Sequence, residues 1–242
     1  MDALADRFHV LAPDTHGAGK GPAWPADRAL ALEDEVTWLE PVFSRARAPF
    51  SLVGHSYGGA VALIAAVHQP ERVRALVLYE PTLFSLVDAA FTASNDVDGI
   101  RQTVERAVSA LATGDRDVAA EHFIDYWMGK GAWRATPLAR RGAIEAAIVN
   151  VHGWGQALFN ETMPLLAFCA LEMPVLLMVG KHSPPSARAV VSLLAQTLPN
   201  VELIAFEGLG HMGPVTHPEV VNRAIKKFLC RSAATCSPGE PQ

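Results

Sequence analysis

The sequence has few of the features that mark secreted, membrane or metal-binding proteins. It holds only three cysteines, Cys169, Cys230 and Cys236, whose odd number and irregular spacing fit neither a disulfide framework nor a metal site. No apolar run approaches the length that spans a bilayer. The amino terminus also lacks the basic and apolar regions of a signal peptide. We therefore expect a cytoplasmic protein without a metal ion.

An excess of charge of one sign is also missing. The 242 residues include 20 basic and 25 acidic ones, for a net charge of −5. Proteins that bind nucleic acids or anionic membranes need a basic surface, which this balance does not favour. Half of the residues are hydrophobic, and a chain of this length can bury one sizeable core. We expect one globular α/β domain without a nucleic-acid or membrane partner.

What the sequence does contain is the stretch G-H-S-Y-G-G at residues 54–59. Pro49–Val53 before it has the pattern of a strand, and Ala60–His68 after it that of a buried helix. A serine at a sharp, glycine-bounded turn from strand to helix is typical of a G-x-S-x-G nucleophile elbow. Glycines flank such a serine because a Cβ there would clash with the strand or helix. Ser56 is thus a candidate nucleophile, the alternative being an ordinary turn that happens to contain a serine.

The rest of the pattern alternates between strands and helices, which predicts a mostly parallel sheet flanked by helices. Residues 81–173 depart from this alternation with a mostly helical pattern, and residues 231–242 are expected to form a disordered tail. Within the helix predicted at Ala26–Ala46, the acidic residues Glu33, Asp34 and Glu35 are expected to face solvent. The further strands are predicted at Phe8–Ala12, Val73–Tyr79, Pro174–Gly180 and Val201–Phe206, and the helices at Ala26–Ala46 (with Asp27 as a candidate N-cap), Ser186–Leu198 and His217–Leu229.

Taken together, these motifs resemble the α/β-hydrolase fold, of the single-domain serine hydrolase type, from about Leu4 to Leu229. The resemblance implies that residues 1–80 and 174–230 form the hydrolase core and that residues 81–173 are inserted as a helical lid. It also implies that Pro13–Gly21 is the loop after the family's fourth strand; the loop is glycine-rich but lacks the spacing of a P-loop. Since three family strands would precede that point, we expect an N-terminally truncated core, from a fragment or a misassigned start codon.

The resemblance also indicates a catalytic constellation, because a serine nucleophile needs a histidine base and an acid that orients the histidine. His211 follows the last predicted strand in a glycine-rich loop, where the family places its histidine. The family's usual aspartate, soon after the strand ending at Gly180, is missing, and no Asp or Glu occurs from Pro174 to Asn200. Some relatives, such as haloalkane dehalogenases, place the acid at the preceding strand end, where this chain has Glu80. Glu80 is therefore our choice; Asp88 and a Ser-His pair without an acid stay open as alternatives.

The function that the resemblance implies is that of a cofactor-independent serine hydrolase. Ser56 would attack an acyl carbonyl and form an acyl-enzyme, His211 would relay the proton, and Glu80 would orient His211. The backbone N–H of Tyr57 would stabilise the oxyanion. In the family the second oxyanion donor follows the third strand, which this sequence lacks, and loss of one donor costs about 10²–10³ in rate.

We expect the substrate to be a small, hydrophobic molecule with an ester, thioester, lactone or activated C–C bond. Four side chains are expected to line its pocket: His55, Trp127, Trp154 and Met212. The alternative is a non-catalytic or decayed binding protein with the same fold, which the missing aspartate and the missing strand would explain. Beyond the small-molecule substrate, a homodimer stays open as a further association.

Overall fold

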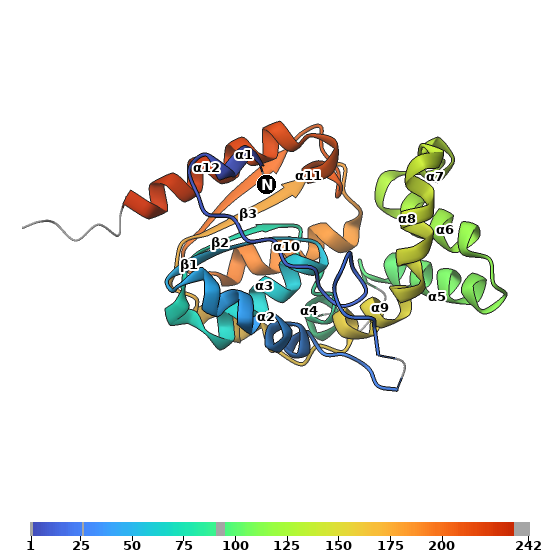
Figure 1. The fold of residues 1–242 in the computed structure, drawn as a ribbon, viewed down its shortest axis with the longest axis horizontal. Helices are drawn as coiled ribbons and strands as arrows, with labels where there is room; N and C mark the ends of the chain where they lie inside the picture. Colours follow the sequence, from blue (N-terminus) through green and yellow to red (C-terminus); the bar gives the residue numbers. More distant parts are fainter. Residues whose placement is uncertain (1, 26, 91–94, 235–242) are drawn as a thin grey trace, which may run out of the picture.

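The computed structural model of the chain describes residues 2–25, 27–90 and 95–234 (Figure 1). Its centre is a sheet of four parallel strands in the order β1-β2-β3-β4. All of β3 is buried, and so is all of β2 except Arg74. This burial explains their nearly continuous apolar sequences, which are typical of parallel strands covered on both faces. The strands are β1 (Phe50–His55), β2 (Val73–Tyr79), β3 (Val175–Gly180) and β4 (Val201–Phe206).

Helices cover both faces of the sheet (Figure 1). Successive side chains of a strand point to opposite faces, so Leu76 packs in one layer and Val77 and Tyr79 pack in the other. The first layer contains α2 (Leu32–Ala46), α3 (Tyr57–His68) and α10 (Pro185–Thr197). The second contains α1 (Asp2–Ala5) and α12 (Pro218–Ala234). The short helices η1 (Pro70–Arg72) and α11 (Gly213–Thr216) lie in connections.

Between β2 and β3 the described residues form helices and no strand. Most of these helices lie beyond one end of the sheet, at the right of Figure 1. Ala107, Ala119 and Ile148 belong to a small core of their own there. The elements are α4 (Ser85–Ala90), α5 (Asp98–Ala112), α6 (Arg116–Met128), α7 (Ala132–Ala135), α8 (Leu138–Ala147), η2 (Ile148–Asn150), α9 (Val151–Phe159) and η3 (Leu165–Ala170).

The first long helix begins later than the sequence predicts. It starts at Leu32, and its N-cap is Ala31 rather than Asp27. The Asp34 carboxylate accepts the Ala31 N–H at 2.9 Å and pairs with Arg28 at 2.8 Å, which fixes the start of the helix. At the other end of the chain, α12 continues through Ala234. The first four residues of the predicted tail are therefore helical, and the remaining eight, 235–242, lie outside the described residues.

The predicted strand at Phe8–Ala12 is wrong. No strand forms there, and this segment pairs with no strand of the described sheet. A cavity of about 600 Å³ lies between Phe8–Pro13 and Phe50–Val53 of β1. The segment therefore lies across this cavity from β1 and forms no backbone hydrogen bond with it. Its apolar residues indicated partial burial correctly, but a ladder needs the two backbones to lie side by side at hydrogen-bonding distance.

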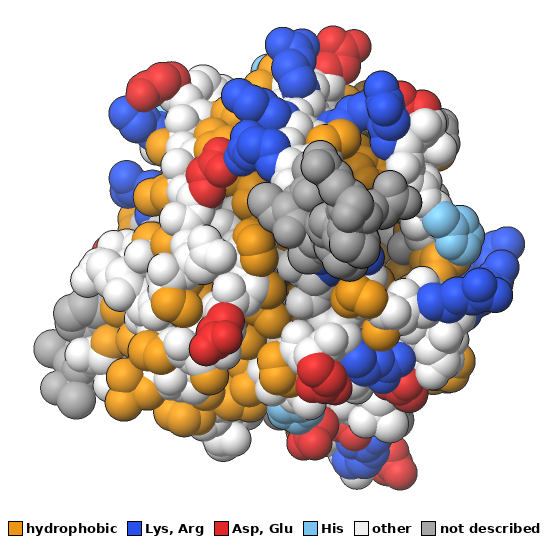
Figure 2. Space-filling model, turned by 90° about the vertical axis from the view of Figure 1, so that its left-hand side faces the viewer, with side chains coloured by type: hydrophobic (Ala, Val, Ile, Leu, Met, Phe, Trp, Pro, Cys, Tyr) orange, Lys and Arg blue, Asp and Glu red, His pale blue; other side chains and the backbone are white. Residues whose placement is uncertain are grey.

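Charged side chains of both signs are interspersed on the side of the molecule that lies at the left of Figure 1. In Figure 2, Lys and Arg side chains near the top of this face alternate with Asp and Glu, and hydrophobic side chains gather lower down. This mixture agrees with the small net charge of the sequence, −5. Among the described residues, every helix is too short or too polar to cross a bilayer.

The turn from β1 to α3 depends on glycine at a position of close backbone approach. A Cβ built on Gly54 would lie 2.4 Å from the carbonyl oxygen of Gly58 and 2.6 Å from the Cα of Gly59. Both obstacles are backbone atoms, which cannot move aside as a flexible side chain can. At Gly58, four residues later, a Cβ would meet no atom within 4 Å. Steric crowding therefore requires glycine at position 54 and does not require it at position 58.

We predict that Gly54→Ala lowers the free energy of unfolding by about 1–3 kcal/mol, the usual cost of forcing extra volume into a packed site. Gly58→Ala is the matched control, and it should keep or slightly raise stability because alanine favours a helix more than glycine does. Urea unfolding followed by circular dichroism measures both. Equal stability of the two variants would contradict this account of the turn.

Candidate active site

The turn holds Ser56 in a strained conformation between two regular elements. β1 ends at His55 and α3 begins at Tyr57, so Ser56 alone connects them, with φ 54° and ψ −122°. Its N–H donates to the Tyr79 carbonyl at 3.1 Å, which continues the pairing of β1 with β2. The N–H groups of Tyr57 and Gly58, in the first turn of α3, have no acceptor among the described residues. They form a donor site next to the serine, at the positive end of a helix.

The structure brings His211 to this serine. His211 Nε2 lies 2.9 Å from Ser56 Oγ, and His211 Nδ1 lies 2.7 Å from Glu80 Oε2. The His211 side chain is 3% exposed and the Glu80 side chain is fully buried. Since a carboxylate can only accept, Nδ1 carries a proton and neutral His211 presents Nε2 as an acceptor to the serine hydroxyl. Ser56, His211 and Glu80 thus form a continuous chain of hydrogen bonds.

Glu80 occupies the end of β2 and is held by donors from the end of β3. Its Oε1 accepts the Gly180 N–H at 2.6 Å and the Ser183 hydroxyl at 2.5 Å, which leaves Oε2 for His211. Donors of this kind offset the cost of burying a carboxylate. Ser183 therefore has a part that sequence reasoning missed. The segment without the expected aspartate supplies the hydrogen bonds that fix a glutamate from the neighbouring strand.

Asp88, the other candidate acid, does not approach His211. It lies on α4, where its carboxylate pairs with Arg101 and accepts a hydrogen bond from Asn95 at 3.2 Å. The Arg101 guanidinium also lies over the Phe159 ring, 4.1 Å from its centroid. These contacts link α4 to α5 and α9, so Asp88 belongs to a structural ion pair and Glu80 alone of the two faces the histidine.

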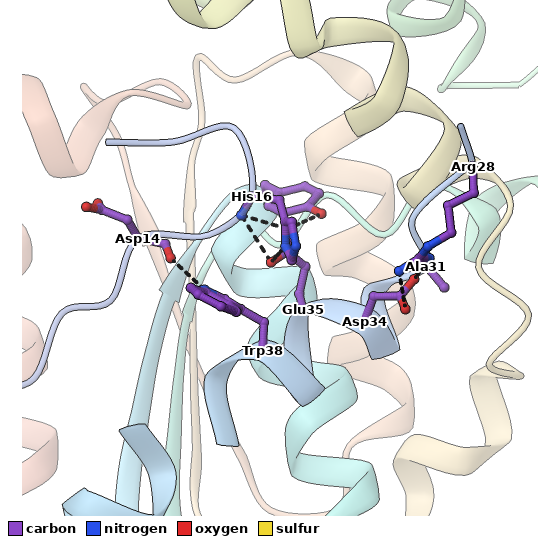
Figure 3. A network of polar contacts seen from close by, with 8 residues as sticks. Asp14, His16, Arg28, Ala31, Asp34, Glu35 and Trp38 are labelled. Carbon is purple, nitrogen blue, oxygen red and sulfur yellow. Dashed lines mark hydrogen bonds and ion pairs between the residues drawn. The ribbon is translucent and has the colours of Figure 1, made fainter. Parts of the chain in front are cut away.

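A second buried carboxylate, that of Glu35, is hydrogen-bonded to the residue that follows Ser56. The sequence-based expectation that Glu35 faces solvent is wrong, because Glu35 on α2 is fully buried. It accepts hydrogen bonds from the Tyr57 hydroxyl at 3.0 Å, from His16 Nδ1 at 2.9 Å and from the His16 N–H (Figure 3). Burial, and then the charge of Glu35, raise the pKa of the Tyr57 hydroxyl, which therefore stays a donor. Glu35 thereby connects α2, the loop around His16 and the first residue of α3.

An apolar cavity of about 270 Å³ opens beside Ser56. Two of the residues predicted for the substrate pocket, Trp127 and Trp154, line this cavity. The described residues form no cluster of three or more His, Cys, Asp or Glu that could hold a metal ion. The other lining residues are Thr15, Ala18, Tyr57, Gly58, Thr82, Phe84, Ile100, Val104, Phe123, Val151, Gly155 and Leu158.

His55 and Met212, the other two predicted pocket residues, do not line this cavity. His55 pairs in register with Tyr79, and its ring packs against the rings of Tyr79 and His211 on the far side of the strand ends. Met212 follows His211 in the chain, and it is the N-cap of α11, where its carbonyl accepts the N–H groups of Val215 and Thr216. Of the four residues predicted for the pocket, these two are therefore not among those that line the cavity beside Ser56.

Trp127 covers one face of the His211 imidazole. The two ring centroids lie 3.9 Å apart with an interplanar angle of 26°, and Trp127 is itself buried. This stacking restricts the orientation of the imidazole ring. It also keeps water from that face of the ring. One tryptophan of α6 therefore contacts the histidine and lines the cavity.

Thr82 adds one polar group to the cavity wall. Its N–H donates to the Ser56 carbonyl at 3.3 Å, and its buried hydroxyl has no hydrogen-bond partner among the described residues. A buried polar group without a partner costs about 1–3 kcal/mol. Apart from Thr15, the tyrosine and the tryptophans, the remaining wall beside the serine is made of apolar side chains and glycine.

Comparisons with known proteins agree with this geometry. A family model described as "alpha/beta hydrolase fold" matches residues 1–218. The chain therefore belongs to the α/β-hydrolase family. Its parallel sheet, its flanking helices and its Ser-His-Glu arrangement are those of a serine-type hydrolase. Membership of this family favours an enzyme over the alternative of a non-catalytic binding protein.

The similar proteins are hydrolases of several kinds. The chain is 24% identical to the (E)-2-((N-methylformamido)methylene)succinate hydrolase of Acinetobacter baylyi, over 95% of this chain and 83% of that protein. It is 27% identical to the lipase LipV of Mycobacterium tuberculosis, over 91% of this chain and 83% of that protein. The enol-lactonase of Burkholderia xenovorans has a similar structure, with a TM-score of 0.73 at 16% identity, over 95% of this chain and 84% of that chain.

We predict that Glu80→Gln slows acylation of Ser56 by p-nitrophenyl acetate on the order of 10⁴-fold, as loss of the acid does in other triads. Because Oε1 already accepts two donors, the new amide would turn its NH₂ group toward His211 Nδ1. His211 would then carry its proton on Nε2 and could not accept the serine proton. Stopped-flow release of nitrophenolate measures the rate.

Asp88→Asn is the matched control, since it makes the same chemical change at an acid that pairs with Arg101. It should leave the acylation rate unchanged. A Glu80→Gln protein that is folded and reacts within a few-fold of the parent would remove Glu80 from the site.

Proposed function

We propose that the protein is a cofactor-independent serine hydrolase that works through an acyl-enzyme at Ser56. The observation that carries this proposal is the hydrogen-bonded chain from Glu80 through His211 to Ser56, with distances of 2.7 and 2.9 Å. This chain supports the roles of Ser56 as nucleophile, His211 as general base and Glu80 as the carboxylate that orients the base, which acyl transfer requires. The proposal also takes the helices of residues 81–173 as a lid, because α6 and α9 supply Trp127 and Trp154 to the cavity beside the serine.

The proposed reaction has two halves. In the first, His211 Nε2 removes the proton of Ser56 while Oγ attacks the acyl carbonyl carbon, and the free N–H groups of Tyr57 and Gly58 receive the oxyanion. His211 then donates this proton to the leaving group, and the acyl group stays on Oγ. In the second half, water gives its proton to His211 and attacks the acyl-enzyme, and Ser56 recovers its proton as the acid leaves. The buried carboxylate of Glu80 stabilises the imidazolium in both halves.

We propose a small, hydrophobic acyl group as the substrate, carried by an ester, thioester, lactone or activated C–C bond. The cavity of about 270 Å³ is at the small end of ligand pockets, and most of its wall is apolar. The unpaired hydroxyl of Thr82 supports one polar atom on the substrate near the reacting carbonyl. A lipase and a hydrolase of a succinate derivative among the relatives support a carboxylic acid derivative.

We predict burst kinetics with p-nitrophenyl acetate and butyrate, with one nitrophenolate released per active site before steady turnover. Intact-protein mass spectrometry of quenched samples should show one acyl group on Ser56. The rate of the burst should fall for the p-nitrophenyl ester of a long-chain acid, because the cavity cannot contain its acyl group. Ser56→Ala is the control, and it should show neither burst nor adduct.

The proposal would be wrong if folded protein released nitrophenolate at the same rate with and without Ser56. It would also be wrong if an acyl group were found on another residue. A burst that increased steadily with acyl length would leave the serine chemistry intact and contradict the small-substrate part.

A further inference from the structure

The loop that carries His211 crosses the ends of three strands, and each of them donates a hydrogen bond to it. Three consecutive carbonyl groups of the loop accept these bonds, one from each strand end. The pairs are His182 N–H to Leu209 at 3.0 Å, Tyr79 Oη to Gly210 at 2.8 Å and His55 Nε2 to His211 at 2.8 Å. His182 follows β3, Tyr79 ends β2 and His55 ends β1. The loop backbone is thus attached in order to β3, β2 and β1.

Two of these three donors are side chains, and they act as a pair. His55 and Tyr79 are register partners in β1 and β2, so their side chains point to the same face of the sheet. Their rings pack edge to face with centroids 5.6 Å apart. The pairing of the two strands therefore holds the two donor side chains next to each other. The two donors reach adjacent carbonyl groups of the loop, those of Gly210 and His211.

Both side chains keep their donor hydrogen over the pH range in which hydrolases work. Burial, and then the charge of His211, lower the pKa of His55 to about 3, so its imidazole is neutral. A carbonyl offers no hydrogen, so Nε2 of His55 must carry the proton. Burial, and then the charge of Glu80, raise the pKa of the Tyr79 hydroxyl. A neutral His55 also places no positive charge beside the imidazolium of His211.

The close approach of the loop depends on two glycines. A Cβ on Gly213 would lie 2.3 Å from the Tyr79 hydroxyl, and a Cβ on Gly180 would lie 2.3 Å from the Leu209 carbonyl oxygen. With a larger side chain at either glycine, or without the three hydrogen bonds, the loop would move away from the strand ends. His211 would move with the loop. Its ring contacts Ser56 through one nitrogen and Glu80 through the other, so a displaced backbone would break this double contact. A displacement of about 1 Å can cost 10²-fold in rate.

We propose that His55 and Tyr79 are positioning residues that fix the backbone of His211 so that its two ring nitrogens meet Ser56 and Glu80. This inference rests on the proposed function for its kinetic consequence, and on the hydrogen bonds alone for its structural one. The x of G-x-S-x-G would then have a defined task. It would hold the base that activates the serine next to it.

The test compares variants that remove one donor with a variant that keeps it. His55→Leu and Tyr79→Phe each remove a donor and leave a carbonyl of the loop without its partner. His55→Gln keeps an amide N–H close to the place of Nε2. We expect kcat for p-nitrophenyl acetate to fall about 10–100-fold in the first two with KM little changed, and to recover most of its value in His55→Gln. Loss of activity in His55→Gln equal to that in His55→Leu would overturn the proposal.

A spectroscopic readout tests the same proposal without turnover. The Nδ1–H of His211, which is hydrogen-bonded to Glu80, should give a low-field proton resonance in the parent, in His55→Gln and in a Ser56→Ala control. It should weaken or disappear in His55→Leu and Tyr79→Phe, while circular dichroism shows the same fold. An unchanged resonance in these two variants would overturn the proposal even if kcat fell.

The two readouts also separate this inference from the proposed function. If the parent does not hydrolyse p-nitrophenyl esters, the proposed function fails, and the resonance still decides whether the two side chains hold His211. If the parent hydrolyses esters and neither kcat nor the resonance responds to loss of the donors, the hydrolase stands and the positioning role falls. If His55→Leu does not fold, Tyr79→Phe, which removes a single oxygen, gives the answer.

Discussion

The buried hydrogen bond between Glu80 and His211 is the interaction on which the rest of the site depends. A carboxylate at this depth is tolerated only when its oxygens are satisfied, and both are: Oε1 by Gly180 and Ser183, and Oε2 by His211. This arrangement ties β2, β3 and the loop after β4 together at one end of the sheet. It also selects the tautomer of His211 and thereby makes Ser56 the donor in its own hydrogen bond. If Glu80 were uncharged or absent, neither the base nor the nucleophile would have a defined role.

Strain in the backbone is concentrated at the same place. Among the described residues, only Arg47, Ser56 and Glu80 combine a side chain with positive φ, and the last two face the same histidine. Strained backbone conformations persist where several independent contacts hold the residue in place. Here Ser56 is fixed by strand pairing and by helix α3, whose first residue is anchored on the buried Glu35. Trp127 then covers His211 from the side of the inserted helices, so the site is formed jointly by the sheet and by these helices.

The sequence allowed the parallel sheet, the turn at Ser56 and the last two strands to be predicted well, because buried parallel strands and a glycine-bounded turn leave strong local patterns. The burial of Glu35 could have been predicted too, since it lies among Leu32, Val36 and Leu39 on the apolar side of α2. The sequence could not show that Phe8–Ala12 stays unpaired. An apolar run indicates that a segment is buried, but it does not indicate which backbone lies beside it. The orientation of His55 was missed for a related reason. The register of β1 against β2 decides it, and register is a property of two strands together.

The measurement that tests the central claim most directly is covalent labelling with a fluorophosphonate, followed by peptide mapping with mass spectrometry. Such a probe reacts with a serine only when a base removes its proton and nearby donors stabilise the charge on the phosphoryl oxygen. The account predicts one label per chain, on the peptide that contains Ser56, and no label after heat unfolding. Folded protein that stays unlabelled, or that carries the label on a residue other than Ser56, would contradict it.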